Sequence, residues 1–181
     1  MTNIFFASDH HFYHKRIREF SPKTRRGESV EEMNELLIQA HNSIVKQNDL
    51  VYFLGDFSFG NAEQTKRIAM RLNGQKHLIL GNHDDIIRRT KEIQELFVTV
   101  QDYKDTSIEK IKISMFHFPI AEFNQQHRGA YHFHGHTHGS YSHAGRGFDV
   151  GIDNRPDDLM QPWVWEDLKR IVKKKPILSH H

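Results

Sequence analysis

Three short apolar segments, separated by two helical segments, constrain what the first half of this chain can fold into. Asn3–Ser8, Leu50–Leu54 and His77–Leu80 are each apolar enough and short enough to form buried strands. The segments between them carry helix signals, so each strand is joined to the next by a helix. This β-α-β-α-β order predicts neighbouring parallel strands, and therefore an α/β sheet.

The two intervening helices have recognisable starts and ends. In the first, apolar residues recur at three- and four-residue steps from Val30 to Ile44, and Ser29 with Glu32 forms a capping box. In the second, Asn61 is the expected N-cap and Gly74 the expected end. These signals predict two crossover helices of ordinary length.

The second half of the chain is richer in strands. Four more are predicted, at Val98–Tyr103, Lys110–Phe116, Ala130–His134 and Gly147–Ile152. A last helix is predicted near Pro162–Lys173, and Ser21–Ser29 is the best candidate for an exposed loop. An α/β half followed by a strand-rich half predicts a two-sheet β-sandwich flanked by helices. With no long linker, residues 1–181 are expected to form a single domain.

Composition limits the chemistry. The chain has no cysteine, which excludes disulfides, thiolate zinc sites and cysteine nucleophiles. Its formal charge of +2 is too small to indicate a nucleic-acid binder by itself. No apolar run reaches the roughly 18 residues that span a bilayer, and the start of the chain lacks the basic residues of a signal peptide. A cytoplasmic protein without a membrane partner is therefore expected, whereas the oligomeric state is left open.

Histidine is abundant, with 15 residues, and the polar residues that follow the predicted strands are of metal-ligand type. They are Asp9, His11, Asp56, Asn82, His83, Asp84, His117, His136 and His138. Because ligands of open α/β sheets gather at the carboxyl ends of the strands, we expect these side chains to converge in one crevice. If the first segment is extended, Asp9 and His11 face one side and His10 packs on the other.

Carboxylate, imidazole and amide oxygen ligands without sulfur favour Mn²⁺, Fe, Zn²⁺, Co²⁺ or Ni²⁺. Glycines directly precede Asp56, Asn82 and His136, where they allow tight turns and close approach of the backbone to an ion or a phosphate.

The order of these residues resembles the calcineurin-like metallophosphoesterase family, whose motifs are D-x-H, G-D, G-N-H-D/E, a lone H and G-H-x-H. Here they read Asp9-His10-His11, Gly55-Asp56, Gly81-Asn82-His83-Asp84, His117 and Gly135-His136-Thr137-His138. The resemblance covers roughly residues 4–153, and the short length looks like the small bacterial and phage-type members. It implies an α/β/β/α architecture with the active site at the carboxyl ends of the strands.

The resemblance also implies two divalent metal ions, with manganese the first expectation and iron, zinc, cobalt or nickel the alternatives. The implied ligands of the first ion are Asp9, His11, Asp56 and His138. Those of the second are Asp56, Asn82, His117 and His136, so that Asp56 bridges the two ions. A hydroxide shared by the two ions would attack phosphorus. His83 is the implied catalytic residue, which stabilises charge or protonates the leaving oxygen, and Asp84 supports it by setting its tautomer.

Substrate contacts are less well defined by the sequence. His14, Arg25 and Arg26 are candidates, since basic residues near the first motif can position a phosphate. The alternatives are a solvated basic surface for the arginines and an exposed position at a helix start for His14. The expected partner is a small phosphate ester or nucleotide. A phosphodiesterase is favoured, because alkoxide leaving groups gain most from a proton donor such as His83. The alternatives are a nuclease on single-stranded nucleic acid, a phosphomonoesterase and a metal-stabilised binding module. His180 and His181 belong either to an expression tag or to the native sequence.

Overall fold

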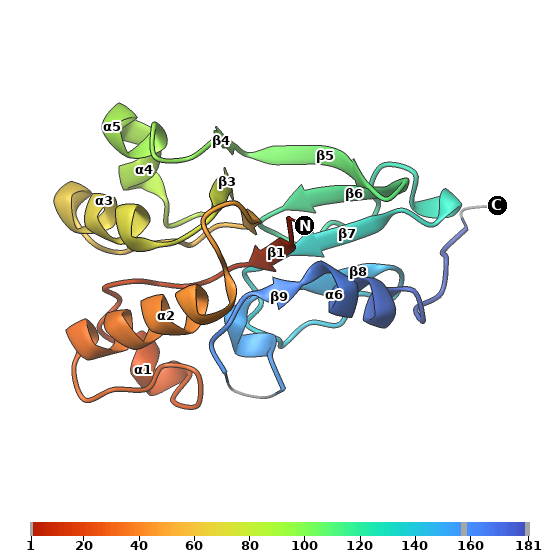
Figure 1. Cartoon of the computed structure of the whole chain (residues 1–181). Coiled ribbons are helices and arrows are strands. Elements are labelled where there is room, and N and C mark those ends of the chain that lie inside the picture. The colour runs from red at the N-terminus through yellow and green to blue at the C-terminus, as the bar shows by residue number, and fades with distance from the viewer. Residues whose placement is uncertain (1, 157–158, 180–181) are drawn as a thin grey trace.

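The computed structural model describes residues 2–156 and 159–179, and its two sheets flanked by helices confirm the predicted α/β class (Figure 1). The pair His180 and His181 lies outside the described residues. The strands are β1 (Ile4–Ala7), β2 (Leu50–Phe53), β3 (Gln75–Ile79), β4 (Thr99–Gln101), β5 (Tyr103–Ile108), β6 (Ile111–Phe116), β7 (Tyr131–His134), β8 (Gly147–Asp149) and β9 (Trp163–Val164). The helices are α1 (Ile17–Phe20), α2 (Val30–Ile44), α3 (Ala62–Arg71), α4 (Asp85–Arg89), α5 (Lys91–Gln94) and α6 (Trp165–Val172). Two short 3-10 turns, η1 (Gln126–Arg128) and η2 (Ile152–Asn154), complete the described elements.

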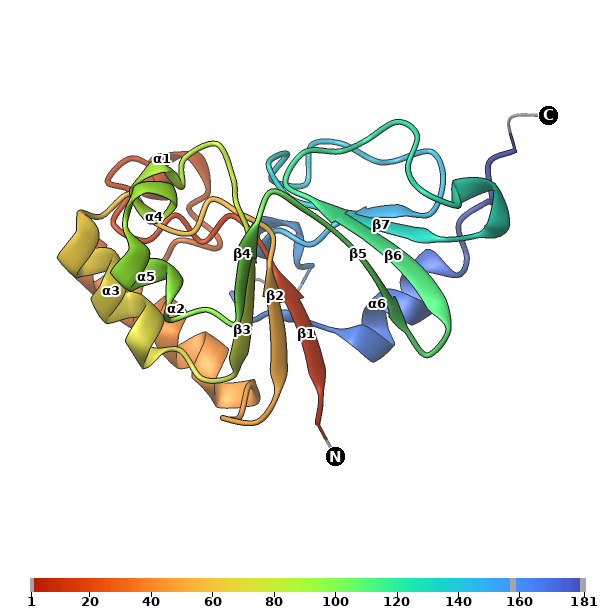
Figure 2. The same cartoon turned by 90° about the horizontal axis from the view of Figure 1, so that it is seen from above.

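The first sheet has the strand order β4-β3-β2-β1-β9. Strands β1 to β4 are parallel and β9 pairs with β1 in the antiparallel direction, so the predicted parallel arrangement of the first three strands is confirmed. The second sheet has the order β5-β6-β7-β8, in which β6, β7 and β8 are parallel and β5 is antiparallel to β6. Seen from above, the two sheets stand next to each other, with α2 to α5 gathered beyond the first (Figure 2).

Successive side chains of the central strands point to opposite faces of the first sheet, and this alternation divides the hydrophobic core into two clusters. In β1, Phe5 belongs to the cluster under the helices, whereas its neighbour Phe6 belongs to the cluster between the sheets. The Phe6 ring lies 4.8 Å from the ring of Phe133 in β7, and α6 adds Trp165 to the same cluster. Each such fully buried side chain stabilises the fold by roughly 1.5–3 kcal/mol. Both faces of the first sheet are therefore fixed, which holds its strand ends in place.

The crossover helices begin where the sequence predicts. The Ser29 side chain accepts a hydrogen bond from the Glu32 N–H at 3.0 Å, although the Glu32 carboxylate bonds to the Glu28 N–H rather than back to Ser29. Asn61 and Gln64 form the complete reciprocal box at the start of α3. That helix ends at Arg71, before Gly74, which turns the chain into β3 with a φ of +102°.

Several boundaries differ from the prediction for local reasons. The predicted strand Val98–Tyr103 is two strands, because β4 ends the first sheet and Tyr103 already begins β5 of the second. Strand β5 was not predicted, since it is a largely polar edge strand. The predicted strand Gly147–Ile152 ends at Asp149, and the last helix begins at Trp165 after the short strand β9. Helices α1, α4 and α5 are too short to give a periodic signal.

Candidate metal centre

The loops that follow β1, β2, β6 and β7 bring six of the predicted ligands into two groups. The first group is Asp9, His11 and His138, and the second is Asp56, His117 and His136. Within each group, one ligand atom of each residue lies within 4.8 Å of the others. Convergence of the strand ends therefore produces two adjoining sites with nitrogen and oxygen donors.

Asp56, a member of the second group, also lies close to the first. Its Oδ2 is 3.7 Å from Nε2 of His11 in the first group and 3.5 Å from Nε2 of His117 in the second. Asn82, from the loop after β3, places its Oδ1 at 3.0 Å from the same nitrogen of His117. The carboxylate of Asp56 can therefore serve both groups, and the amide oxygen of Asn82 belongs to the second.

The ligands converge through backbone turns and not through strand alternation. Asp9 and His11 have φ angles of 58° and 51°, in the left-handed region, so the extended conformation expected for them is wrong. Asp56, His136 and His138 are also left-handed, with φ of 52°, 68° and 47°. Non-glycine residues adopt this region uncommonly, and such strain clusters at functional sites. The loops are therefore shaped for the positions of these side chains.

His10, between the first two ligands, packs as expected. Its ring is buried and stacks on Phe12 with the ring centroids 5.4 Å apart.

Two glycines permit the close approach of the loops. A Cβ on Gly81 would lie 2.3 Å from both the backbone nitrogen and Oδ1 of Asp56. A Cβ on Gly135 would lie 1.9 Å from Oγ of Ser8 and 2.6 Å from Oδ2 of Asp9. Since carbon does not approach other heavy atoms this closely, glycine is required at both positions.

The hydrogen bonds of the histidines leave nitrogens free for metal ions. His117 bonds through Nδ1 to the carbonyl of Leu54 at 2.7 Å, which directs Nε2 toward its fellow candidate ligands Asp56 and Asn82. His138 bonds through Nδ1 to Oδ2 of Asp153 at 2.6 Å, which leaves its Nε2. Neither ring nitrogen of the buried His11 has a hydrogen-bond partner in the protein. Buried polar atoms are rarely left unsatisfied, so these residues fit two divalent cations.

Burial and charge interactions shift the pKa values of several side chains in the candidate metal centre. Burial opposes ionisation of Asp56, but hydrogen bonding and charge interaction with His117 hold its pKa at about 2. Asp9 is more deeply buried, and burial raises its pKa to about 7. The pKa of His138 is raised although burial opposes it, because Asp153 and Asp9 favour the imidazolium. By contrast, burial lowers the pKa of His11 to about 3, so its ring nitrogens are held neutral, as metal ligation requires.

His83 and Asp84 have different surroundings. His83 is exposed; its backbone N–H donates to Oδ1 of Asp56 at 3.0 Å, and its ring centroid lies 6.0 Å from that of His11. Asp84 is buried, and its carboxylate accepts hydrogen bonds from the backbone N–H groups of Phe57 and Gly81, each at 2.8 Å. The expectation that Asp84 orients the His83 ring is therefore wrong: Asp84 ties together the loops after β2 and β3.

The three predicted substrate contacts separate in the structure. His14 is partly buried, with its ring 4.2 Å from that of Phe59. Arg25 is only 2% exposed and forms an ion pair with Asp153 at 2.9 Å, so its expected place on a surface rim is wrong. Arg26, on the same loop, is exposed. Arg25 also donates to the backbone carbonyl of Asp9, and it therefore supports the first ligand group from beneath.

Two buried carboxylates near the last motif were missed by the sequence reasoning. Asp153 bonds to His138, and Asp149 accepts hydrogen bonds from the Thr137 hydroxyl at 2.6 Å and the Gly139 N–H at 2.8 Å. Both hold the G-H-x-H loop in place. Neither lies in a recognisable motif, and a carboxylate 10 to 15 residues beyond its partner has no periodic signal.

This fold and this ligand arrangement agree with the comparison against known families. The model of the calcineurin-like phosphoesterase superfamily domain matches residues 3–149. The chain therefore belongs to the calcineurin-like phosphoesterase superfamily.

The relatives of the chain include an archaeal and a phage protein. An uncharacterized protein of Methanocaldococcus jannaschii is 38% identical over 96 residues, which cover 52% of this chain and 53% of that protein. The Gene 66 protein of Mycobacterium phage D29 is 28% identical over 163 residues, covering 76% of this chain and 79% of that protein. The chain spans about half the length of the first of these relatives.

A solved structure shares the whole fold. The crystal structure of a protein of unknown function from Aquifex aeolicus, AQ665, matches with a TM-score of 0.70 and 22% identity. The match covers 94% of this chain and 100% of that one, and it shows likeness of fold. Among the described residues of this chain, no helix is long and apolar enough to cross a membrane.

Proposed function

We propose that this protein is a dinuclear metal-dependent phosphodiesterase, with Mn²⁺ as the preferred ion. The observation that carries the proposal is the pair of ligand groups on either side of Asp56, with the exposed His83 next to them. The carboxylate and amide oxygens of the site suit Mn²⁺, and its imidazoles also suit Fe, Zn²⁺ or Ni²⁺. A pair of such ions, when bound, lowers the pKa of water and neutralises phosphate oxygens.

The residues of the chain have separate roles in this proposal. Asp9, His11 and His138 hold one ion, Asn82, His117 and His136 hold the other, and Asp56 binds both. The backbone N–H of His83 donates to Asp56, which fixes the position of this residue in its loop. The His83 ring therefore lies beside the ligand groups but is not itself a ligand. From this position it can give a proton to the leaving oxygen of the substrate.

The reaction class can be tested with purified protein and two chromogenic esters. With Mn²⁺, the protein should hydrolyse bis-p-nitrophenyl phosphate faster than p-nitrophenyl phosphate, and chelation should abolish both reactions. Faster turnover of the monoester would overturn the preference for diesters. Two bound metal ions per chain without hydrolysis of any phosphate ester would instead indicate a binding module.

His83 provides the sharpest single-residue test. His83→Ala should lower kcat for a diester with an alkoxide leaving group by about 10²- to 10⁴-fold, because a positioned proton donor contributes this much. Elemental analysis should still find two metal ions per chain, since the side chain of His83 is not a ligand in the proposal. Unchanged turnover in the variant would remove the catalytic assignment.

A further inference from the structure

Two exposed phenylalanines border the candidate metal centre. Phe59 follows Asp56 in the loop after β2 and is 39% exposed. Its ring centroid lies 4.6 Å from that of His83 and 5.2 Å from that of His11. Its backbone N–H donates to the carbonyl of Phe12 at 2.8 Å, which fixes the base of the loop. A rigid aromatic surface therefore stands directly beside the proposed proton donor.

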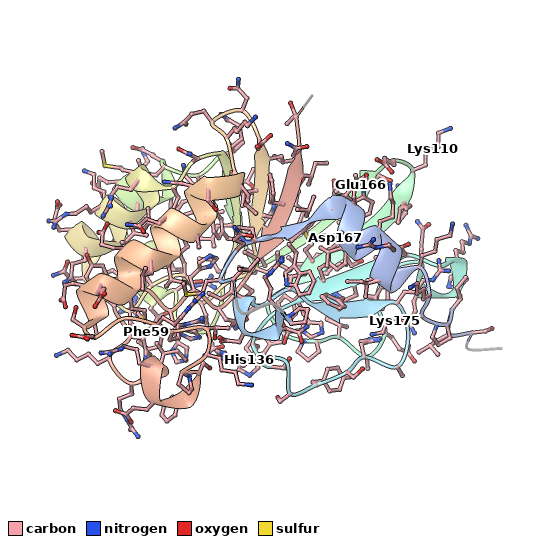
Figure 3. The ribbon with its side chains drawn as sticks, turned by 60° about the horizontal axis from the view of Figure 1, so that its bottom comes forward. Phe59, Lys110, His136, Glu166, Asp167 and Lys175 are labelled. Carbon is pink, nitrogen blue, oxygen red and sulfur yellow. The ribbon has the colours of Figure 1, made fainter. Side chains whose placement is uncertain are left out.

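Phe118 occupies the corresponding place on the second sheet. It follows His117 at the end of β6 and is 36% exposed. Its ring centroid lies 4.5 Å from that of His136 and 5.0 Å from that of His117. Phe59 thus borders the first ligand group and Phe118 borders the second. Figure 3 shows Phe59 and His136 along the same side of the molecule.

We propose that Phe59 and Phe118 are stacking surfaces for nucleobases, so that the substrates of the proposed phosphodiesterase are nucleotide phosphodiesters. An exposed Phe forfeits part of the stabilisation that its burial would provide, and both rings lie against histidines of the centre instead of in either core cluster. A phosphate held between the ligand groups would have its two substituents directed toward these rings. Aromatic rings bind bases of any sequence, because every base has a π-face.

The position of Phe59 also indicates which of the two nucleosides of the substrate lies against each phenylalanine. His83 would protonate the leaving oxygen, and the Phe59 ring is in contact with the His83 ring. The nucleoside that leaves should therefore stack on Phe59, and the nucleoside that keeps the phosphate should lie toward Phe118. This inference rests on the proposed function for its reaction, but stacking itself is measurable by binding alone.

The test compares a sugar phosphate that carries a base with one in which a hydroxyl replaces the base. In the presence of Mn²⁺, calorimetry should show that thymidine 5′-monophosphate binds about 10-fold more tightly than 2-deoxyribose 5-phosphate, the lower end of the range for base stacking on an aromatic ring. In the Phe59→Leu/Phe118→Leu double variant, the two ligands should bind equally. The matched control is Phe20→Leu, which replaces a 62% exposed phenylalanine on α1 and should keep the 10-fold preference.

The possible results separate this inference from the proposed function. Equal binding of both ligands by the unmodified protein, or an undiminished preference in the double variant, would overturn the stacking role even if bis-p-nitrophenyl phosphate is hydrolysed. A preference that depends on the two rings, without hydrolysis of any ester, would support stacking and overturn the phosphodiesterase. Leucine keeps most of the apolar volume at exposed positions, and thermal unfolding of the variants checks that they remain folded.

Discussion

At the scale of single residues, Asp153 connects three other side chains around the candidate metal centre, although it lies outside the motifs. Its carboxylate bonds to Nδ1 of His138, pairs with the buried guanidinium of Arg25, and accepts from the Thr24 hydroxyl. Arg25 in turn donates to the carbonyl of Asp9. One carboxylate thus fixes the orientation of one ligand directly and supports a second through Arg25.

Asp153→Asn should weaken the ion of the first ligand group. The neutral amide oxygen is a weaker acceptor than the carboxylate and therefore lowers the basicity of His138. Loss of such an outer contact typically lowers metal affinity 10- to 100-fold. Titration of Mn²⁺ followed by electron paramagnetic resonance should show one weakened site and one unchanged site.

Thr24→Ala is the control for Asp153→Asn, because it removes a hydrogen bond to the same carboxylate and leaves the charge in place. Two unaltered Mn²⁺ affinities in Asp153→Asn would show that His138 does not depend on this partner.

At the scale of elements, the strands and crossover helices were predictable and several turns were not. Apolar runs and caps such as Ser29 and Asn61 act locally, so the sequence shows them directly. The motifs likewise identified the residues that the loops bring together. The left-handed turns at Asp9 and His11, and the partners of Asp84 and Arg25, depend on contacts between distant segments, which no local pattern encodes.

The loop after β7 should not tolerate a side chain at Gly135. Gly135→Ala places a methyl group 1.9 Å from Oγ of Ser8 and 2.6 Å from Oδ2 of Asp9, so the loop must move away from β1. Steric misfits of this kind cost about 1–3 kcal/mol. Urea unfolding should show this loss together with reduced metal binding.

Gly145→Ala serves as the comparison for Gly135→Ala, because its added carbon meets chiefly the flexible side chain of Leu178, at 2.9 Å. Equal stability of the two variants would contradict the close approach of the β7 loop to β1.

The packing of α2 on the first sheet should depend on pH through His41. Its ring is fully buried, stacks on Phe53 with centroids 5.7 Å apart, and bonds to the carbonyl of Asn73 at 3.0 Å. Burial lowers its pKa from 6.5 to about 4. Between these two values the unfolded chain binds a proton that the folded chain does not, so stability falls as the pH falls.

Substitution by glutamine isolates this effect. The stability advantage of the unmodified protein over His41→Gln should shrink by about 3 kcal/mol between pH 7 and pH 4, since each pKa unit corresponds to about 1.4 kcal/mol. Urea unfolding at several pH values measures it. A difference between the two proteins that stays constant with pH would contradict the depressed pKa.

At the scale of the whole molecule, positive charge gathers away from the candidate metal centre. A cavity of about 480 Å³ is lined by six basic residues, which are Lys110, Lys112, Arg128, Arg146, Lys169 and Lys173. It lies at the starts of β6 and β7, whereas His117 and His136 follow the ends of these strands. Six residues of β6 correspond to about 20 Å, and Figure 3 shows Lys110 well separated from His136.

This separation predicts weak salt dependence of catalysis. At physiological ionic strength, charges more than about 8 Å apart are largely screened, so the basic cavity should contribute little to binding at the centre. For a dinucleotide substrate, kcat/KM should change less than about threefold between 50 and 200 mM NaCl. A nuclease that holds a strand through several phosphates would lose about 10³- to 10⁵-fold in affinity over this range. Such a loss would favour the nuclease alternative.

The left-handed backbone at five ligand positions also restricts which sequences can evolve at this site. Aspartate, asparagine and histidine are the non-glycine residues most enriched in that conformation, and two of them are the ligands found here, at Asp9, His11, Asp56, His136 and His138. Selection for metal binding and selection for loop geometry thus favour the same few side chains. A lineage that lost its metal would still keep these residue types. Selection would act against a β-branched residue at these positions, because such a residue disfavours the left-handed backbone.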